Sequence, residues 1–99
     1  MESAMVPVLN HSIRDLVLDE LAYVRGCTRT EVDAELNGHD DLEIDSKRGQ
    51  TVAIRVELRL GMDGLIRPED QRRENLTGVA SLTELVVRRI AALTHEEGC

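Results

Sequence analysis

Apolar residues recur at helical spacing in the first quarter of the chain. They place one apolar stripe along a helix and comprise Ile13, Leu16, Val17, Leu21 and Val24. Ser12 followed by Asp15 has the spacing of a weak capping box, and Gly26 stands where such a helix would end. We therefore predict a first helix between Ser12 and Gly26. Residues 1–10 have no clear period and are predicted to form a flexible tail.

A second helical stripe lies near the other end of the chain. Its members are Leu82, Leu85, Val86, Ile90 and Leu93. Ser81 and Glu84 form an S-x-x-E capping box just before it, which predicts a last helix that runs to about Leu93. Residues 95–99 are predicted to form a second flexible tail, so the folded domain is expected to span residues 11–94.

The connections between these helices carry weaker signals. Residues 27–45 form a long connection that is predicted to contain a short turn near Thr30–Leu36. Loops of this length are uncommon in compact domains and are often functional. Pro68 is followed by two acidic residues, which is typical of the first turn of a helix, and this short helix is expected to end near Gly78.

The central segment fits two secondary structures. Apolar residues alternate with other residues from Val52 to Leu60, and this pattern slightly favours a half-buried strand after a hairpin turn at 46–49. A helix is also consistent, because it would bury one stripe between a start signal at Asp45-Ser46 and a stop signal at Gly61. That stripe consists of Gly49, Val52, Ala53, Val56 and Leu60.

Composition narrows the function classes. The 99 residues suit one domain, and Tyr23 is the single aromatic residue, so the core must be aliphatic. The net charge of −7 argues against nucleic-acid binding, which needs a concentrated positive surface. Seven carboxylates and no Lys or Arg lie between Glu31 and Asp45, whereas four of the five charged residues in 47–59 are basic. A partner protein could recognise this change of sign.

Other candidate sites are weaker. Asp41-x-Glu43-x-Asp45 lacks the glycine and the final glutamate of a calcium loop, and His11, His39 and His95 lack metal-ligand spacing. Two cysteines, Cys27 and Cys99, do not make a disulfide framework. We expect no metal site and no catalytic residue. The chain has no apolar run of membrane-spanning length, so we expect a cytoplasmic protein without a membrane partner.

The segments that flank Ser46 resemble acyl and peptidyl carrier proteins. Residues 31–36 and 41–46 are similar to the approach to the attachment serine of that family, and residues 75–85 are similar to its short third helix and the entry to its fourth. An Asp-Ser pair opens the family's second helix, and a glycine often closes it, as Gly61 does here. The resemblance covers most of the chain, from Leu16 to Leu93.

This resemblance decides for a helix over 46–60. It implies an all-α fold, a four-helix acyl-carrier-like bundle with a long first loop and a short third helix. It also implies a discrete acyl or aminoacyl carrier, with a 4'-phosphopantetheine arm attached to Ser46. Asp45 is expected to be read by a phosphopantetheinyl transferase. The other partners would be loading and synthase enzymes of fatty-acid, polyketide or nonribosomal-peptide biosynthesis, and the carrier itself is expected to be a monomer and not an enzyme.

The outer face of the predicted second helix is the expected partner-binding surface. Its residues are Lys47, Ile54, Arg55, Leu58 and Arg59. Lys47 departs from the family, which usually has Leu or Met there, and Gly49 and Gln50 stand where apolar residues are usual. The competing prediction is a small α+β interaction module with a central hairpin and no cofactor. A further alternative keeps the carrier fold without the arm.

Overall fold

The computed structural model describes residues 2–39 and 41–98, with side chains for 9–39 and 41–93. These residues form an all-α domain without a strand, which confirms the all-α part of the predicted fold class. The four-helix carrier arrangement stays a prediction. The elements in chain order are α1 (Glu2–Arg25), α2 (Arg29–Leu36), α3 (Ser46–Leu60), the 3₁₀ helix η1 (Pro68–Asp70), α4 (Arg73–Leu76) and α5 (Val79–Gly98).

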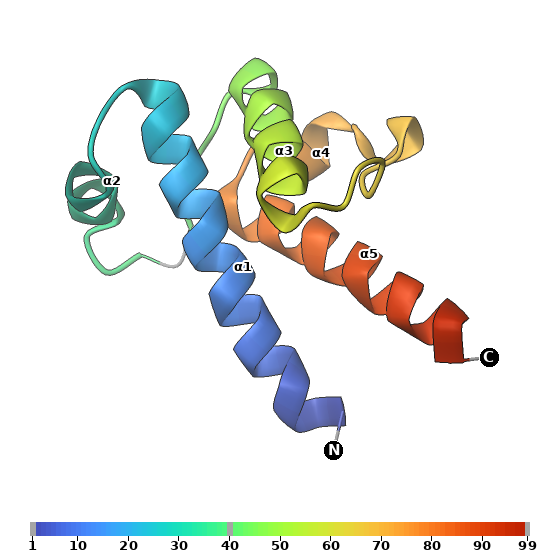
Figure 1. Cartoon of the computed structure of the whole chain (residues 1–99). Coiled ribbons are helices and arrows are strands. Elements are labelled where there is room, and N and C mark those ends of the chain that lie inside the picture. The colour runs from blue at the N-terminus through green and yellow to red at the C-terminus, as the bar shows by residue number, and fades with distance from the viewer. Residues whose placement is uncertain (1, 40, 99) are drawn as a thin grey trace.

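The three longer helices make the framework of the domain. α1 packs against both α3 and α5, and α2 lies on the outer side of α1 (Figure 1). α4 packs between α3 and α5, and both chain ends lie at the lower end of this view. The buried apolar residues form one core and are all Leu, Val, Ile or Ala. The prediction of an aliphatic core is therefore confirmed.

α3 is a helix, so the strand and hairpin predicted as an alternative for 46–60 are absent. Gly49, Val52, Ala53 and Val56 are buried on one face, as the helical stripe predicted. Ile54 and Leu58, which belong to the alternating pattern, are 53% and 69% exposed. The helix is favoured because its buried face packs against α1 and α4, whereas a strand over these residues would have required a neighbouring strand.

Both end helices are longer than their apolar stripes predicted. α1 begins at Glu2 rather than near Ser12, so the proposed capping box at Ser12 and Asp15 is wrong. Leu9 lies one turn before Ile13 on the same face and packs against the core, which extends the buried stripe backwards. α5 continues to Gly98 rather than ending at Leu93. The flexibility predicted for residues 1–10 and 95–99 stays a prediction.

α2 replaces the short turn predicted inside the first connection. Thr28 is its N-cap and forms a capping box with Glu31, a T-x-x-E signal that the sequence contained and our prediction missed. Arg29 ties the start of α2 to α1, because its guanidinium donates to Asp15 and Asp19, both at 2.9 Å, and also to Asp33. These contacts lower the pKa of Asp15, chiefly through the Arg29 hydrogen bond.

Asp41 supplies a cap that sequence spacing could not show. One of its carboxylate oxygens accepts the backbone N–H groups of Leu42 and Ala80, at 2.8 and 2.9 Å. Ala80 lies in the first turn of α5, so this carboxylate caps α5 from a distant loop. Ser81 lies inside α5 and donates to the Gly78 carbonyl, so the predicted N-cap at Ser81 is wrong.

The segment predicted as a short helix from Pro68 to Gly78 is divided into η1 and α4. Asp70, at the end of η1, accepts hydrogen bonds of 2.5 and 2.6 Å from the guanidinium of Arg89 on α5. This bidentate pair holds the η1 segment against α5. The Arg89 hydrogen bond is the main reason why the pKa of Asp70 lies below its usual value.

Gly49 permits the close contact between α3 and α4. A Cβ atom at this position would overlap the backbone carbonyl of Leu76, whose side chain is 1% exposed. The apolar residue that carrier proteins usually have at this place would therefore not fit here. This constraint fixes the distance of α4 from the start of α3.

Gly49→Ala is expected to destabilise the protein by about 1–3 kcal/mol, because a forced backbone shift outweighs the better helix propensity of alanine. Gln50→Ala, on the exposed face of the same helix, is the matched control and should change the free energy of unfolding by less than about 0.5 kcal/mol. Urea unfolding of both variants measures the difference. Equal stability of the two variants would contradict the close contact.

Asp70→Asn should cost about 1–2 kcal/mol at neutral pH, because it removes the charge that binds Arg89. The folded pKa of Asp70 is lowered, so its contribution is complete above the unfolded value of about 3.9 and is lost as pH falls through the folded value. Urea unfolding at pH 7 and at progressively lower pH should therefore show the gap to wild type closing in acid. The exposed Asp63→Asn is the control, and a gap that is constant with pH would contradict the assignment.

Candidate functional site

Ser46 is the first residue of α3 and is exposed. Asp45 is the N-cap, and its Oδ1 accepts the backbone N–H of Arg48 at 2.9 Å. Within the described part of the chain, the Ser46 hydroxyl has no hydrogen-bond partner. The capping function at this helix start therefore belongs to Asp45 and not to the hydroxyl of Ser46.

Ser46 stands at the edge of an open hollow of about 570 Å³. The hollow lies between the start of α3 and the α4 region, and its lining residues are Glu43, Ile44, Asp45, Ser46, Arg73 and Thr77. Two backbone hydrogen bonds hold its two sides together, from Ile44 to the Thr77 carbonyl at 2.9 Å and from Val79 to the Leu42 carbonyl at 3.0 Å. Residues distant in sequence are thus brought to one site.

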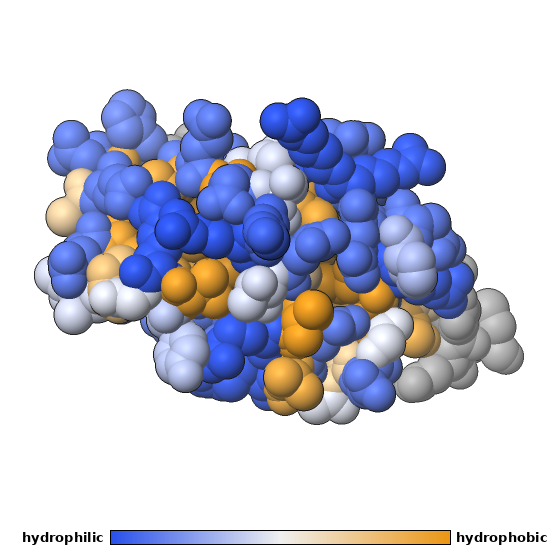
Figure 2. Space-filling view, turned by 90° about the horizontal axis from the view of Figure 1, so that it is seen from above, coloured by the Kyte–Doolittle hydropathy of each residue, from blue (hydrophilic) through white to orange (hydrophobic). Residues whose placement is uncertain are grey.

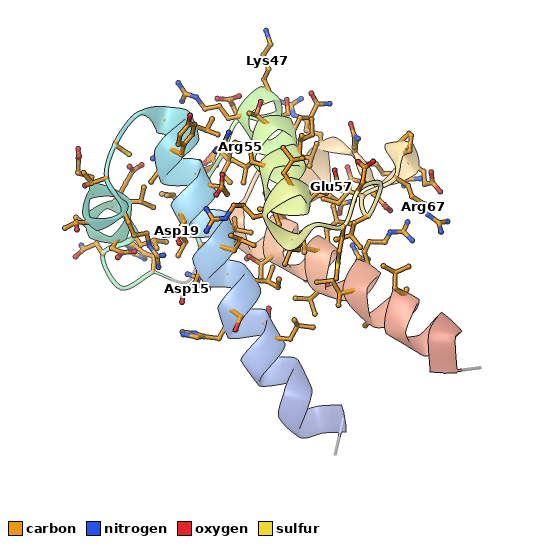
Figure 3. All side chains as sticks on the ribbon, viewed as in Figure 1. Asp15, Asp19, Lys47, Arg55, Glu57 and Arg67 are labelled. Atoms are coloured by element: carbon orange, nitrogen blue, oxygen red, sulfur yellow. The ribbon has the colours of Figure 1, made fainter. Side chains whose placement is uncertain are left out.

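The charges around this hollow are mixed. Glu43 and Asp45 contribute carboxylates, and Arg73 contributes a guanidinium. Lys47 follows Ser46 directly but extends away from the amino-terminal end of α3 into solvent (Figure 3). The sequence predicted Ser46 and Asp45 as site residues. It gave no signal for Arg73, because no local spacing relates α4 to the start of α3.

Arg55 and Arg59 are not a free basic face. Both reach back to Glu20 of α1, whose side chain is 2% exposed, and donate to its two carboxylate oxygens at 2.6 and 2.8 Å. The Arg55 guanidinium also lies 3.8 Å above the centre of the Tyr23 ring. Figure 3 shows Arg55 extending from α3 toward α1. Glu20 lies within the predicted apolar stripe, four residues after Leu16 and four before Val24, so this spacing indicated a buried carboxylate that our prediction missed.

The remaining predicted partner residues are exposed. Ile54 and Leu58 lie one turn apart on α3, on the side away from its buried face. Tyr23 is 66% exposed, and its ring lies against the Arg55 guanidinium. On the face that Figure 2 shows, hydrophilic residues predominate, with apolar patches between them.

The other candidate sites stay without a ligand set. Among the described residues, no group of three His, Cys, Asp or Glu side chains could hold a metal ion. Cys27 is a partly buried free thiol, and the side chain of His95, like Cys99, lies outside the described residues. None of the described helices combines the length and the apolar character needed to cross a bilayer.

Comparisons with known proteins returned no relative. No protein-family model, no curated protein and no solved structure matches this chain.

Glu20→Gln is expected to destabilise the protein by about 1–3 kcal/mol, because two guanidinium groups lose the charge that they bind while the residue stays buried. The loss of stability is limited because Arg59 is 58% exposed and its guanidinium can be solvated instead. Asp19→Asn is the matched control, since Asp19 is an exposed neighbour paired with Arg29, and should cost less than about 1 kcal/mol. Equal losses in thermal unfolding would show that the Glu20 pair contributes no more than a surface pair.

Proposed function

We propose that this protein is a discrete acyl or aminoacyl carrier whose working residue is Ser46. The observation that carries the proposal is the exposed hydroxyl at the first position of α3, which has no hydrogen-bond partner among the described residues and stands beside an N-cap that Asp45 already supplies. A serine in this position can be modified without loss of a structural hydrogen bond. The long α1, α3 and α5 with the short α4 would correspond to the four helices of the carrier bundle, with α2 in its long first loop.

The proposed modification is a phosphoryl transfer. A phosphopantetheinyl transferase would use the Ser46 Oγ to attack the β-phosphorus of coenzyme A, which forms a phosphodiester and releases adenosine 3',5'-bisphosphate, while a base of the transferase takes the serine proton. Free N–H groups at the start of α3 favour an added anion there. When attached, the 4'-phosphopantetheine arm supplies a thiol that carries the cargo as a thioester.

The partner enzymes would approach from the side of α3. Lys47, Ile54 and Leu58 are the exposed contacts on this side, and Arg59 keeps part of its guanidinium in solvent. Glu20 neutralises much of the positive charge of Arg55 and Arg59, so the proposed docking depends more on apolar contact than on a basic surface. The carrier would act as a monomer in the cytoplasm and leave catalysis to its partners.

A second function is favoured by a specific observation. Tyr23, Ile54 and Leu58 expose apolar surface on α1 and α3, which suits a protein-interaction module that has no cofactor. The two functions differ in one measurable property, which is the ability of Ser46 to take the arm.

Ser46→Ala should abolish the mass increase that wild type shows after incubation with coenzyme A and a broad-specificity phosphopantetheinyl transferase. The free energy of unfolding should change by less than about 0.5 kcal/mol, because the hydroxyl makes no hydrogen bond among the described residues. Ser12→Ala, at an exposed serine of α1, is the matched control and should be modified like wild type. Intact-protein mass spectrometry and circular dichroism measure both properties.

Asp45→Asn tests the neighbouring carboxylate separately. Asparagine also caps helices well, so the fold should persist while modification slows if the transferase reads the charge. Folded wild type that takes no arm from several transferases would exclude the carrier function and leave the interaction module. A Ser46→Ala variant that still gains the arm would show that the attachment site is elsewhere.

A further inference from the structure

Arg73 and Ser46 line the same hollow from different helices. Arg73 is the first residue of α4, and Ser46 is the first residue of α3. The close packing of Gly49 against Leu76 fixes α4 beside this end of α3. The backbone pairing of Ile44 with Thr77 fixes the loops on either side of the hollow. The origin of the Arg73 side chain is therefore held in place relative to the serine.

Arg73 differs from the arginines that stabilise the fold. Arg29, Arg55, Arg59 and Arg89 each bind carboxylates of another element. The Arg73 side chain makes no ion pair or hydrogen bond with any residue that the structure describes. Among the residues that line the hollow, it is the one that carries a positive charge. Its guanidinium is thus available to an anion that enters the hollow.

A phosphodiester at Ser46 would create a local excess of negative charge. Glu43 and Asp45 already contribute two carboxylates to the lining, and the phosphodiester would add a third negative group. Like charges that line one hollow repel each other, and this repulsion destabilises the folded state unless a cation offsets it. A guanidinium suits this function, because its planar N–H groups can bind two phosphate oxygens together.

We propose that Arg73 is the counter-ion of the phosphodiester at Ser46 and holds the base of the arm in the hollow. The inference rests on the proposed modification of Ser46 and assigns Arg73 as a positioning residue. Arg73 would have no partner in the unmodified protein and would gain one on modification. Modification would therefore change the environment of Arg73 and make stability depend on its charge.

The first experiment compares Arg73→Ala with Arg72→Ala. Arg72 precedes Arg73 directly but bonds to the Glu69 carbonyl and lines a different hollow, so its removal makes the same change in net charge away from Ser46. Wild type and both variants are converted by the transferase and coenzyme A, and their unfolding temperatures are measured before and after conversion at low salt. Conversion should lower the unfolding temperature of Arg73→Ala by about 2–5 °C more than that of wild type or Arg72→Ala. High salt should reduce this difference.

The second experiment needs no variant. In wild type, the side-chain Nε–H resonance of Arg73 should shift between the unmodified and the modified protein, whereas that of Arg72 should stay in place. This comparison tests the contact between Arg73 and the phosphodiester even if Arg73→Ala is modified poorly. Normal modification with no Arg73 shift and equal temperature changes in the two variants would overturn the inference and leave the carrier function intact. Wild type that takes no arm at all would overturn both.

Discussion

The buried carboxylate of Glu20 determines how α3 lies against α1. Each of its oxygens accepts a hydrogen bond from one arginine of α3, and the two arginines are one helical turn apart. A carboxylate that is 2% exposed is costly to bury unless it is paired, so α3 cannot slide or rotate on α1 without leaving this charge unsatisfied. An aliphatic core alone would define that register less strictly, because Leu, Val and Ile side chains can repack.

The contact of α3 with α4 is constrained by shape instead of charge. Gly49 admits the backbone of α4 at a distance that any side chain would prevent. The loop before α3 is joined to the start of α5 by backbone hydrogen bonds and by the Asp41 cap. Together these contacts place the start of α3 and the α4 region around one hollow. The geometry proposed for the modified serine is a consequence of how these segments are held.

The same contacts change the interpretation of the α3 surface. Arg55 and Arg59 were expected to offer a basic face to a partner, but a large part of their charge is used inside the domain. Most exposed residues of α3 are polar or charged, and Ile54 and Leu58 are the large apolar side chains among them. Arg73 lies on α4, a helix of four residues that was not part of the predicted partner surface. It is the positively charged residue in the lining of the hollow.

The sequence by itself determined the helical stripes, the aliphatic core and the Asp45–Ser46 start of α3, because each depends on residues within a few positions of one another. Its periodicity alone fitted both a helix and a strand for 46–60. The resemblance of the flanking segments favoured the helix, and packing against α1 and α4 stabilises it. The cap of α5 by Asp41, the pairing of Glu20 with two arginines of α3 and the position of Arg73 depend on contacts between distant segments. Local spacing holds no record of such contacts, so the tertiary structure alone decided them.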